Sequence, residues 1–329
     1  MTSHTTGSAE GSDCRAQPVV ALVVPCYNEE ASLPIALPVL CSILDGMAES
    51  GAVSASSYIL CVDDGSNDAT WHVIEHMHRR DGRVKGLRLA HNSGQQSALY
   101  AGLMCVGGRC DAAVTVDADL QDSPEAIADM VERYREGFDI VYGVRSSRQT
   151  DTWFKRNSAH AFYRLQHLLG MDTVYDHSEF RLMSALAIGM LADYPEHNLY
   201  IRGIMPHIGL SSTTVSYDRA ARTAGESKYS LGKLLSTSVD GITSFSAKPM
   251  RMIFFTGALL LVLDIAVAVW VLLSYLGGRA IFGWSSMMLS LWLLTSLVLM
   301  AIGVVGEYVG KIFNEVKRRP RYAVAETLF

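Results

Sequence analysis

Two long apolar segments near the end of the chain restrict its fold more than any other feature. Residues 253–275 contain one charged residue, Asp264, and residues 284–306 contain none. A helix of either length spans roughly 34 Å at ~1.5 Å per residue, which is enough to cross a hydrocarbon core of ~30 Å. The alternative, two buried helices of a soluble domain, would normally show polar stripes. We therefore predict two transmembrane helices.

Basic residues are unevenly distributed around these segments. Lys248 and Arg251 precede the first segment, and Arg279 lies in the short connection between the two. Five more follow the second segment: Lys311, Lys317, Arg318, Arg319 and Arg321. Because Lys and Arg favour the cytoplasmic side, we predict a transmembrane hairpin with both termini in the cytoplasm. Asp264 would be costly against lipid, so we expect it to face another helix, which suggests a homo-oligomer.

The sequence divides into five predicted parts. The first residues are rich in Ser, Thr, Gly and Asp and lack the apolar core of a signal peptide, which predicts disorder. Apolar residues recur at helical spacing just before the first span, which predicts a helix at the membrane surface, or alternatively one packed on the head. The parts are a disordered tail (1–17), a cytosolic head (18–230), an amphipathic juxtamembrane segment (231–251), two transmembrane helices (252–308) and a cytosolic basic tail (309–329). We expect an integral protein of the inner or plasma membrane.

Overall charge and cysteine placement exclude two classes of protein. The formal net charge is −5, which argues against a general nucleic-acid binder. All six cysteines precede residue 111, and none forms a CxxC pair. We therefore expect reduced thiols rather than a disulfide framework or a zinc site.

Apolar runs alternate with helix-like segments in the head. The expected strands are 19–24, 58–62, 84–89, 112–117 and 139–144. The expected helices begin near Glu29 or cover about 69–80, 94–106 and 124–136. This alternation predicts βαβ units and an α/β domain with a mainly parallel, Rossmann-like sheet.

Ligands of such sheets bind beyond the carboxyl ends of the strands. In chain order, those ends read "PCYNEE", "DDGSND", "AHNSGQ", "DADLQD" and "GVRSSR". The first contains no GxGxxG motif and no Walker A motif is present, so hydride transfer and P-loop ATP hydrolysis are disfavoured. Taken alone, "DDGS" is better explained as a turn that caps a helix.

The fourth strand end places Asp117, Asp119 and Asp122 close together. Two like charges ~5 Å apart repel by on the order of 3 kcal/mol at an effective dielectric of about 20. Mg²⁺ and Mn²⁺ take oxygen ligands and commonly share them between carboxylates and phosphates. The cluster therefore predicts a divalent cation that bridges to a nucleotide diphosphate.

Several motifs in order resemble family 2 glycosyltransferases. They are "VVPCYNEEASLP", "CVDDGSNDAT", "NSGQQSALYAGL", "VDADLQDSPE", "VYGVRSSR", "WFKR", "EFRLM" and "GESKYS". The sequence is most similar to polyprenyl-phosphate members, such as bactoprenol glucosyltransferases and dolichyl-phosphate mannose synthase, over roughly residues 18–250. The resemblance implies a GT-A catalytic head. It also implies metal-dependent, inverting transfer of a single sugar from a nucleotide sugar, UDP favoured over GDP, to polyprenyl phosphate at the cytoplasmic membrane face.

The same resemblance implies roles for individual residues. The nucleoside would be held by Pro25, Tyr27, Glu29, Val62 and Asp64. Asp117, Asp119 and Gln121 would hold Mg²⁺ or Mn²⁺ and the diphosphate, with Ala118 also at the substrate. Phosphates would face Arg145, Arg156, Arg222 and Lys228, and the catalytic residues would be Asp119, Glu179 and Arg145. Gln95 and Gln96 are expected to begin a helix near the nucleotide without chemistry of their own.

The sequence departs from the family pattern at one place and leaves two alternatives open. Bactoprenol glucosyltransferases usually carry "GDFRL" where this chain has "SEFRL", so the longer Glu179 replaces Asp. Residues Met171–Glu179 are expected to form a loop over the acceptor. One alternative is a processive polysaccharide synthase, although its QxxRW motif is missing; the other is a non-catalytic membrane scaffold with a degenerate head.

Overall fold

The structure is a computed structural model. It describes residues 15, 17–145, 177–194, 196 and 201–218, scattered positions between 253 and 273, and residues 283–329. The chain divides into two compact units. The first comprises Met1–His160, Thr173–Lys228 and Pro320–Phe329, and the second comprises Ala161–Asp172 and Tyr229–Arg319.

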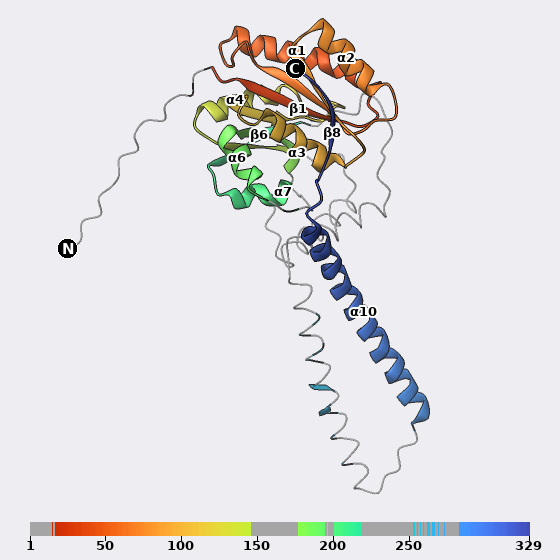
Figure 1. Ribbon diagram of the computed structural model, residues 1–329. Coiled ribbons are helices and arrows are strands. Elements are labelled where there is room, and N and C mark those ends of the chain that lie inside the picture. Colours follow the sequence, from red (N-terminus) through yellow and green to blue (C-terminus); the bar gives the residue numbers. More distant parts are fainter. Residues whose placement is uncertain are drawn as a thin grey trace, which may run out of the picture. The chain divides into compact units, whose positions relative to one another are not determined.

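The described residues of the first unit form one sheet with helices packed on it (Figure 1). The sheet has eight strands in the order β7-β5-β6-β4-β1-β2-β3-β8. β1 pairs in parallel with β2 and β4, β3 continues the parallel run, and β7 is parallel to β5. The predicted mainly parallel, Rossmann-like sheet is confirmed, and the five expected strands lie within two residues of their expected ends. The strands are β1 (Val20–Cys26), β2 (Tyr58–Asp63), β3 (Val84–Leu89), β4 (Ala112–Thr115), β5 (Ile140–Arg145), β6 (His177–Ser184), β7 (Ser212–Tyr217) and β8 (Val324–Leu328).

Strand β6 corrects one prediction. Residues Met171–Glu179 were expected to form a loop, but His177–Glu179 belong to β6, which runs antiparallel between β4 and β5; residues 171–176 lie outside the described residues. Its side chains alternate, so Phe180 joins the apolar core while Glu179 and Arg181 lie on the other face. Because this strand begins with polar residues, it lacks the apolar run by which the others were recognised.

Helices cover both faces of the sheet. Leu22 and Val24 of β1 pack in one apolar core with side chains of α1, α2 and α4. On the opposite face, a Cβ at Gly102 of α3 would lie 2.5 Å from Val23 Cγ1, so this glycine allows α3 to approach β1 closely. The helices are α1 (Leu33–Glu49), α2 (Thr70–Arg80), α3 (Gln95–Val106), α4 (Ala126–Arg135), α6 (Ala185–Ala192), α7 (Ile201–Ile204) and the 3₁₀ helix η1 (Met205–Ile208).

The last residues of the chain return to the sheet, which the sequence analysis did not predict. β8 pairs antiparallel with the outer edge of β3, and the Ala90 N–H donates a hydrogen bond to the Ala323 carbonyl (2.8 Å). The Arg321 guanidinium lies 4.4 Å from the ring centre of Tyr100 on α3 and donates to the Tyr194 carbonyl (2.7 Å). The segment after residue 319 therefore covers an exposed sheet edge and contacts α3.

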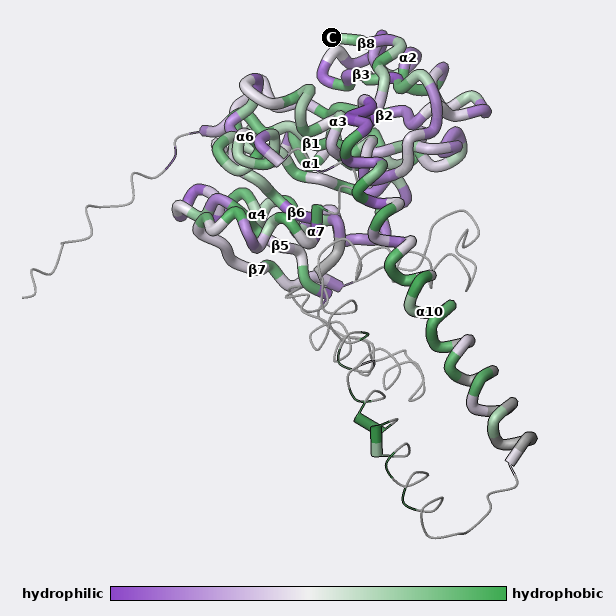
Figure 2. The backbone as a smooth tube through the Cα atoms, turned by 60° about the horizontal axis from the view of Figure 1, so that its bottom comes forward, coloured by the Kyte–Doolittle hydropathy of each residue, from purple (hydrophilic) through white to green (hydrophobic). Residues whose placement is uncertain are grey.

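Helix α10 (Trp284–Lys317) belongs to the second unit and contains the whole of the second predicted span. Apolar residues line it (Figure 2), and Leu299 and Ile302 are more than half exposed. Among the described residues, one helix segment, Leu297–Lys317, is long and apolar enough to cross a membrane. The first predicted span, 253–275, lies outside the described residues except at scattered positions, so the hairpin stays a prediction.

Deleting residues 324–329 should destabilise the head. The deletion removes the main-chain pairing of β8 with β3 and the Phe329 ring, which lies 4.6 Å from the Arg109 guanidinium. At ~1 kcal/mol net for each of a few hydrogen bonds, we expect a loss of about 2 kcal/mol and a melting temperature lower by about 4–8 °C in detergent. The control is Phe329→Ala, which keeps the strand and should show a smaller change. An unchanged melting temperature after the deletion would contradict the assigned edge pairing.

Candidate active site

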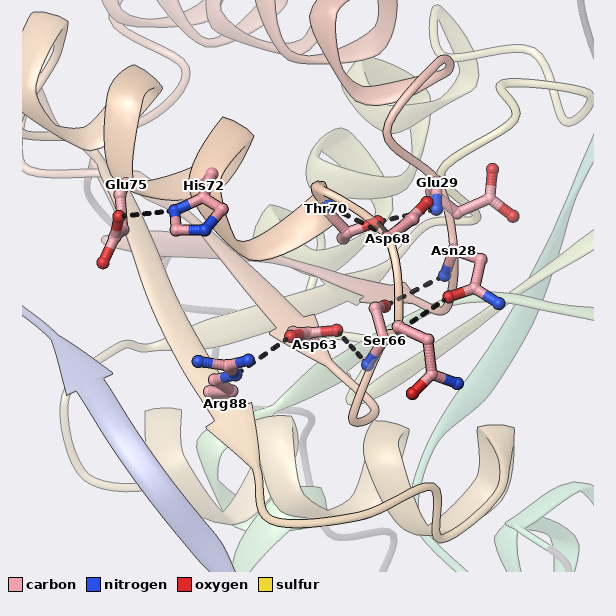
Figure 3. Close-up of polar contacts among 10 residues, drawn as sticks. Asn28, Glu29, Asp63, Ser66, Asp68, Thr70, His72, Glu75 and Arg88 are labelled. Carbon is pink, nitrogen blue, oxygen red and sulfur yellow. Dashed lines mark hydrogen bonds and ion pairs between the residues drawn. The ribbon is translucent and has the colours of Figure 1, made fainter.

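The loops that follow β1 and β2 are locked together by hydrogen bonds (Figure 3). The Asn28 N–H donates to Ser66 Oγ (2.9 Å), and the Asn67 N–H donates back to Asn28 Oδ1 (2.9 Å). The Glu29 N–H donates to Thr70 Oγ1 (2.8 Å). Asn28 has a φ of 54°, a left-handed conformation that Asn adopts more readily than other non-glycine residues. The loop that carries Tyr27 and Glu29 is therefore held in one shape.

Asp63, the last residue of β2, and Asp64, which follows it, connect these two loops to the end of β3 and the loop after it. Asp63 is fully buried, accepts a hydrogen bond from the Ser66 N–H (3.0 Å) and lies 3.6 Å from Arg88 Nε. Asp64 accepts hydrogen bonds from the N–H groups of Ser93 (2.7 Å) and Gly94 (2.9 Å), while its burial raises its pKa. The visible contacts of Asp64 therefore hold the start of α3 against the end of β2.

A glycine makes this close approach of the loops possible. Gly65 has a φ of +65°, and a Cβ at this position would lie 2.6 Å from the backbone carbon of His91. Any other residue would clash with the loop after β3, so the "DDGS" stretch is more than a turn that caps a helix.

The predicted acidic cluster lies in a tight turn after β4. The Leu120 N–H donates to the Asp117 carbonyl (3.3 Å), and the Gln121 N–H donates to Asp119 Oδ1 (3.2 Å). Leu120 has a φ of 48°, which is strained for a bulky residue. Such strain is typical of functional sites. Because β4 pairs in parallel with β1, the turn that carries Asp117 and Asp119 lies at the same rim of the sheet as Asn28.

The third carboxylate of the cluster has a different role. Asp122 is buried, accepts a hydrogen bond from the Tyr217 hydroxyl (2.7 Å) and lies 3.7 Å from Arg145 Nη2. It therefore anchors the turn to β7 and β5. Arg145, at the end of β5, is thereby placed beside the acidic turn.

Crowding of carboxylates governs the electrostatics of the turn. The pKa of Asp117 is raised to about 7, first by burial and then by the negative charges of Asp122, Asp119 and Glu179, while Arg202 acts in the opposite direction. Within the described ranges, no group of three or more His, Cys, Asp or Glu converges to hold a metal ion. Two carboxylates and the Gln121 amide suit a hard cation that completes its shell with phosphate oxygens, so the donor set fits Mg²⁺ or Mn²⁺.

A second polar cluster, which the sequence analysis largely missed, lies beside the turn. Glu179 pairs with Arg181 Nη2 through Oε2 (2.6 Å) and with Arg202 Nε through Oε1 (2.8 Å). Gln96 Nε2 donates to the same Glu179 Oε1 (2.9 Å), and Gln95 Nε2 donates to Asp117 Oδ1 (3.2 Å). Gln95 therefore contacts the acidic turn and Gln96 contacts the second cluster, and neither contact was expected from the sequence. The one feature that could have indicated this cluster is Arg202, a single charge in the apolar run "LYIRGIM".

The other predicted site residues occupy varied positions. Pro25 and Val62 face each other in the β1–β2 register, but the Val62 side chain is fully buried beneath α3. Tyr27 and Glu29 are partly buried at the rim, and Ala118 is buried within the acidic turn. Three predicted basic residues lie outside the described residues: Arg156, Arg222 and Lys228. The five cysteines in the described part of the chain are free thiols, as expected.

Comparison with known proteins identifies relatives along almost the whole chain. Residues 21–191 match the model of Glycosyl transferase family 2. The chain is 46% identical over 315 residues to the Bacillus subtilis protein named uncharacterized glycosyltransferase YkoT, covering 96% of this chain and 94% of that protein. It is 35% identical over 310 residues to the bactoprenol glucosyl transferase of Shigella phage SfII, covering 94% of this chain and 98% of that protein. A solved structure of the mannosyltransferase PcManGT from Pyrobaculum calidifontis, in complex with GDP-Man and Mn²⁺, is similar at 14% identity and a TM-score of 0.47. The match covers 91% of this chain and 89% of that one.

Replacing Asp117 with Asn should stabilise the protein at alkaline pH in EDTA. The native pKa of about 7 lies above the ordinary value of 3.8, so the wild-type protein loses stability as the pH rises through that window, whereas an amide does not ionise. We expect the variant to be more stable at pH 8, with the advantage shrinking by about 1.4 kcal/mol per pH unit between pH 7 and pH 4. Denaturant titrations between pH 4 and pH 8 measure this difference in the free energy of unfolding.

The matched control for that titration is Glu125→Gln on the exposed side of the same segment. A hydrogen bond from Ser123 lowers the pKa of Glu125, so its neutralisation should give no stability gain at pH 8. A difference between Asp117→Asn and wild type that does not vary with pH would contradict the charge-crowding explanation.

Proposed function

The chain belongs to glycosyl transferase family 2 and is a glycosyltransferase, and we propose that it transfers a single sugar from a nucleotide sugar to polyprenyl phosphate. The acidic turn after β4 is the observation that carries this proposal, because its crowded carboxylates suit a cation bound to a donor diphosphate. The acceptor is proposed from the relatives, which include the bactoprenol glucosyl transferase of Shigella phage SfII. We favour UDP over GDP as the donor nucleotide.

The donor would lie along the rim formed by the ends of β1, β2 and β4. In this proposal Asp117, Asp119 and Gln121 hold Mg²⁺ or Mn²⁺, which would neutralise charge on the departing nucleoside diphosphate. Tyr27 and Glu29 lie at the same rim and would contact the nucleoside. Pro25, Val62, Asp64 and Ala118 would then shape the pocket from beneath, because three of them are buried and the fourth belongs to a paired strand.

Transfer would occur by direct attack of an acceptor phosphate oxygen on the anomeric carbon, with inversion. A polyprenyl phosphate is already an anion at neutral pH, so the main requirement is to bring two anions together. Arginines meet this requirement by pairing with phosphate oxygens. Arg145 lies beside the acidic turn, and Arg156, Arg222 and Lys228 stay predicted members of the same basic wall.

The proposed membrane arrangement follows from the sequence and from α10. An exposed apolar helix supports membrane association, and the distribution of Lys and Arg supports a hairpin with the head and both termini in the cytoplasm. The domain boundaries of the sequence analysis and a homo-oligomer are part of this proposal. A head attached to the membrane would meet a lipid-linked phosphate at the surface where it is presented.

Replacing Asp119 with Asn should abolish sugar transfer. The test supplies undecaprenyl phosphate, Mn²⁺ or Mg²⁺ and a panel of UDP- and GDP-sugars to purified protein in detergent, and resolves lipid-linked products by chromatography. We expect one sugar per lipid with the wild type and a loss of about 100-fold or more with the variant, because the leaving diphosphate loses its cation.

Glu125→Gln is the control, since Glu125 lies in the same segment but is exposed and bonded to Ser123. It should retain wild-type activity. Near wild-type transfer by Asp119→Asn would refute the assigned site. A polymeric product would instead favour the processive synthase, and failure of the wild type to bind any nucleotide sugar would favour the scaffold.

A further inference from the structure

Glu179 is a buried carboxylate that binds two arginines at once. Its two oxygens pair with Arg181 (2.6 Å) and Arg202 (2.8 Å). The Arg181 side chain is 1% exposed, whereas that of Arg202 is 33% exposed. One arginine is therefore internal and the other reaches the surface, and the three charges together leave one net positive charge beside the acidic turn.

Gln96 forms hydrogen bonds on both sides of the ion pair between Glu179 and Arg202. Gln96 Nε2 donates to Glu179 Oε1 (2.9 Å), and Gln96 Oε1 accepts a hydrogen bond from the N–H of Ile201 (3.1 Å), the residue before Arg202. The next residue back along α3, Gln95, donates to Asp117 (3.2 Å). Consecutive residues of α3 therefore connect the Arg202 cluster with the predicted metal-binding turn.

The contacts of Glu179 occupy both of its carboxylate oxygens. Each oxygen pairs with one guanidinium group. Such a carboxylate can hold an arginine in a fixed orientation. Guanidinium groups bind phosphate through directional, charge-assisted hydrogen bonds, and Arg202 reaches the surface beside the turn that would hold the donor diphosphate.

We propose that Arg202 binds a substrate phosphate group, and that Glu179 is a positioning residue that orients Arg202. This inference rests on the proposed function and replaces the catalytic role expected for Glu179. The phosphate belongs either to the donor diphosphate or to the acceptor lipid, because both present the same oxyanion chemistry. Gln96 fixes the pair, so α3 connects this cation to the acidic turn.

Two variants test the proposal by steady-state kinetics. Arg202→Lys keeps the charge but loses the planar fork, and Arg202→Gln loses both. We expect KM for one phosphate-bearing substrate to rise about tenfold in Arg202→Gln and less in Arg202→Lys, because the remaining charge partly compensates. A rise for undecaprenyl phosphate assigns the acceptor, and a rise for the nucleotide sugar assigns the donor. A lower kcat with both KM values unchanged would overturn the proposal.

Glu179→Gln separates positioning from proton transfer. As a positioning residue, Glu179 should affect the same KM as Arg202, leave the pH profile of kcat in place, and add little to the effect of Arg202→Gln in the double variant. Loss of the acidic limb of the kcat profile in Glu179→Gln would identify a general base and overturn the positioning role. Melting temperatures establish that each variant is folded, and Arg202→Lys tests the proposal by itself if Glu179→Gln fails to fold.

A binding measurement distinguishes failure of this inference from failure of the proposed function. Calorimetry with UDP and Mn²⁺, and separately with undecaprenyl phosphate in detergent, requires no turnover. The control is Arg79→Gln on α2, whose side chain is 72% exposed and pairs with Glu75; it should bind like wild type. Weaker binding of one ligand by Arg202→Gln supports the inference even if no sugar is transferred. Unchanged binding of both ligands refutes it even if transfer is observed.

Discussion

Repulsion among carboxylates at the end of β4 is the constraint on which the rest of the site depends. Asp117 is partly buried and faces the charges of Asp122, Asp119 and Glu179, so its ionised form is unfavourable in the folded protein. The surroundings of the turn limit this repulsion by pairing Asp122 with Tyr217 and Arg145. Asp117 and Asp119 lie in the same turn, where a cation would relieve the remaining repulsion while binding a diphosphate.

The antiparallel strand β6 is what brings a second set of charges to this rim. Because β6 lies next to β4, Thr115 Oγ1 donates to the Glu179 carbonyl, and Arg181 lies opposite Thr115 in the register. Alternation along the strand then places Glu179 and Arg181 on one face and Phe180 in the core, where it packs edge-on against Tyr217. The same aromatic pair leaves no room for a side chain at Gly143. Packing of the apolar face therefore fixes the charged face.

The sequence was sufficient to predict the five strands β1 to β5 but insufficient to predict β6, β7 and β8, of which β7 is parallel to β5. Strands β1, β2, β4 and β5 are largely apolar, and β3 is apolar apart from Lys85 and Arg88, so these five stand out in the sequence. β7 is rich in Ser and Thr and does not stand out, although it pairs in parallel with β5. β6 begins with polar residues that partners elsewhere in the chain neutralise, and β8 is short with mostly exposed side chains, so neither has a comparable pattern. The acidic turn was visible because its residues are adjacent in sequence. Arg202 was not predicted, and Gln96 was expected at a helix start but not at Glu179, because folding rather than sequence spacing brings both residues to Glu179.

The contacts of Glu179 offer a physical explanation for a Glu at the position where bactoprenol glucosyltransferases usually have Asp. The carboxylate of Glu179 accepts hydrogen bonds from Arg181 within its own strand and from Gln96 on α3, and it forms an ion pair with Arg202 on α7. The proposed acceptor phosphate would already be ionised and would need no base, but it would need cations whose positions do not change when it arrives. A carboxylate held by three partners from three elements supplies that rigidity, because moving any one partner leaves a buried charge less well paired. The side chain of Glu is one methylene group longer than that of Asp, so the Glu179 carboxylate extends farther from β6 toward Gln96 and Arg202 on separate elements.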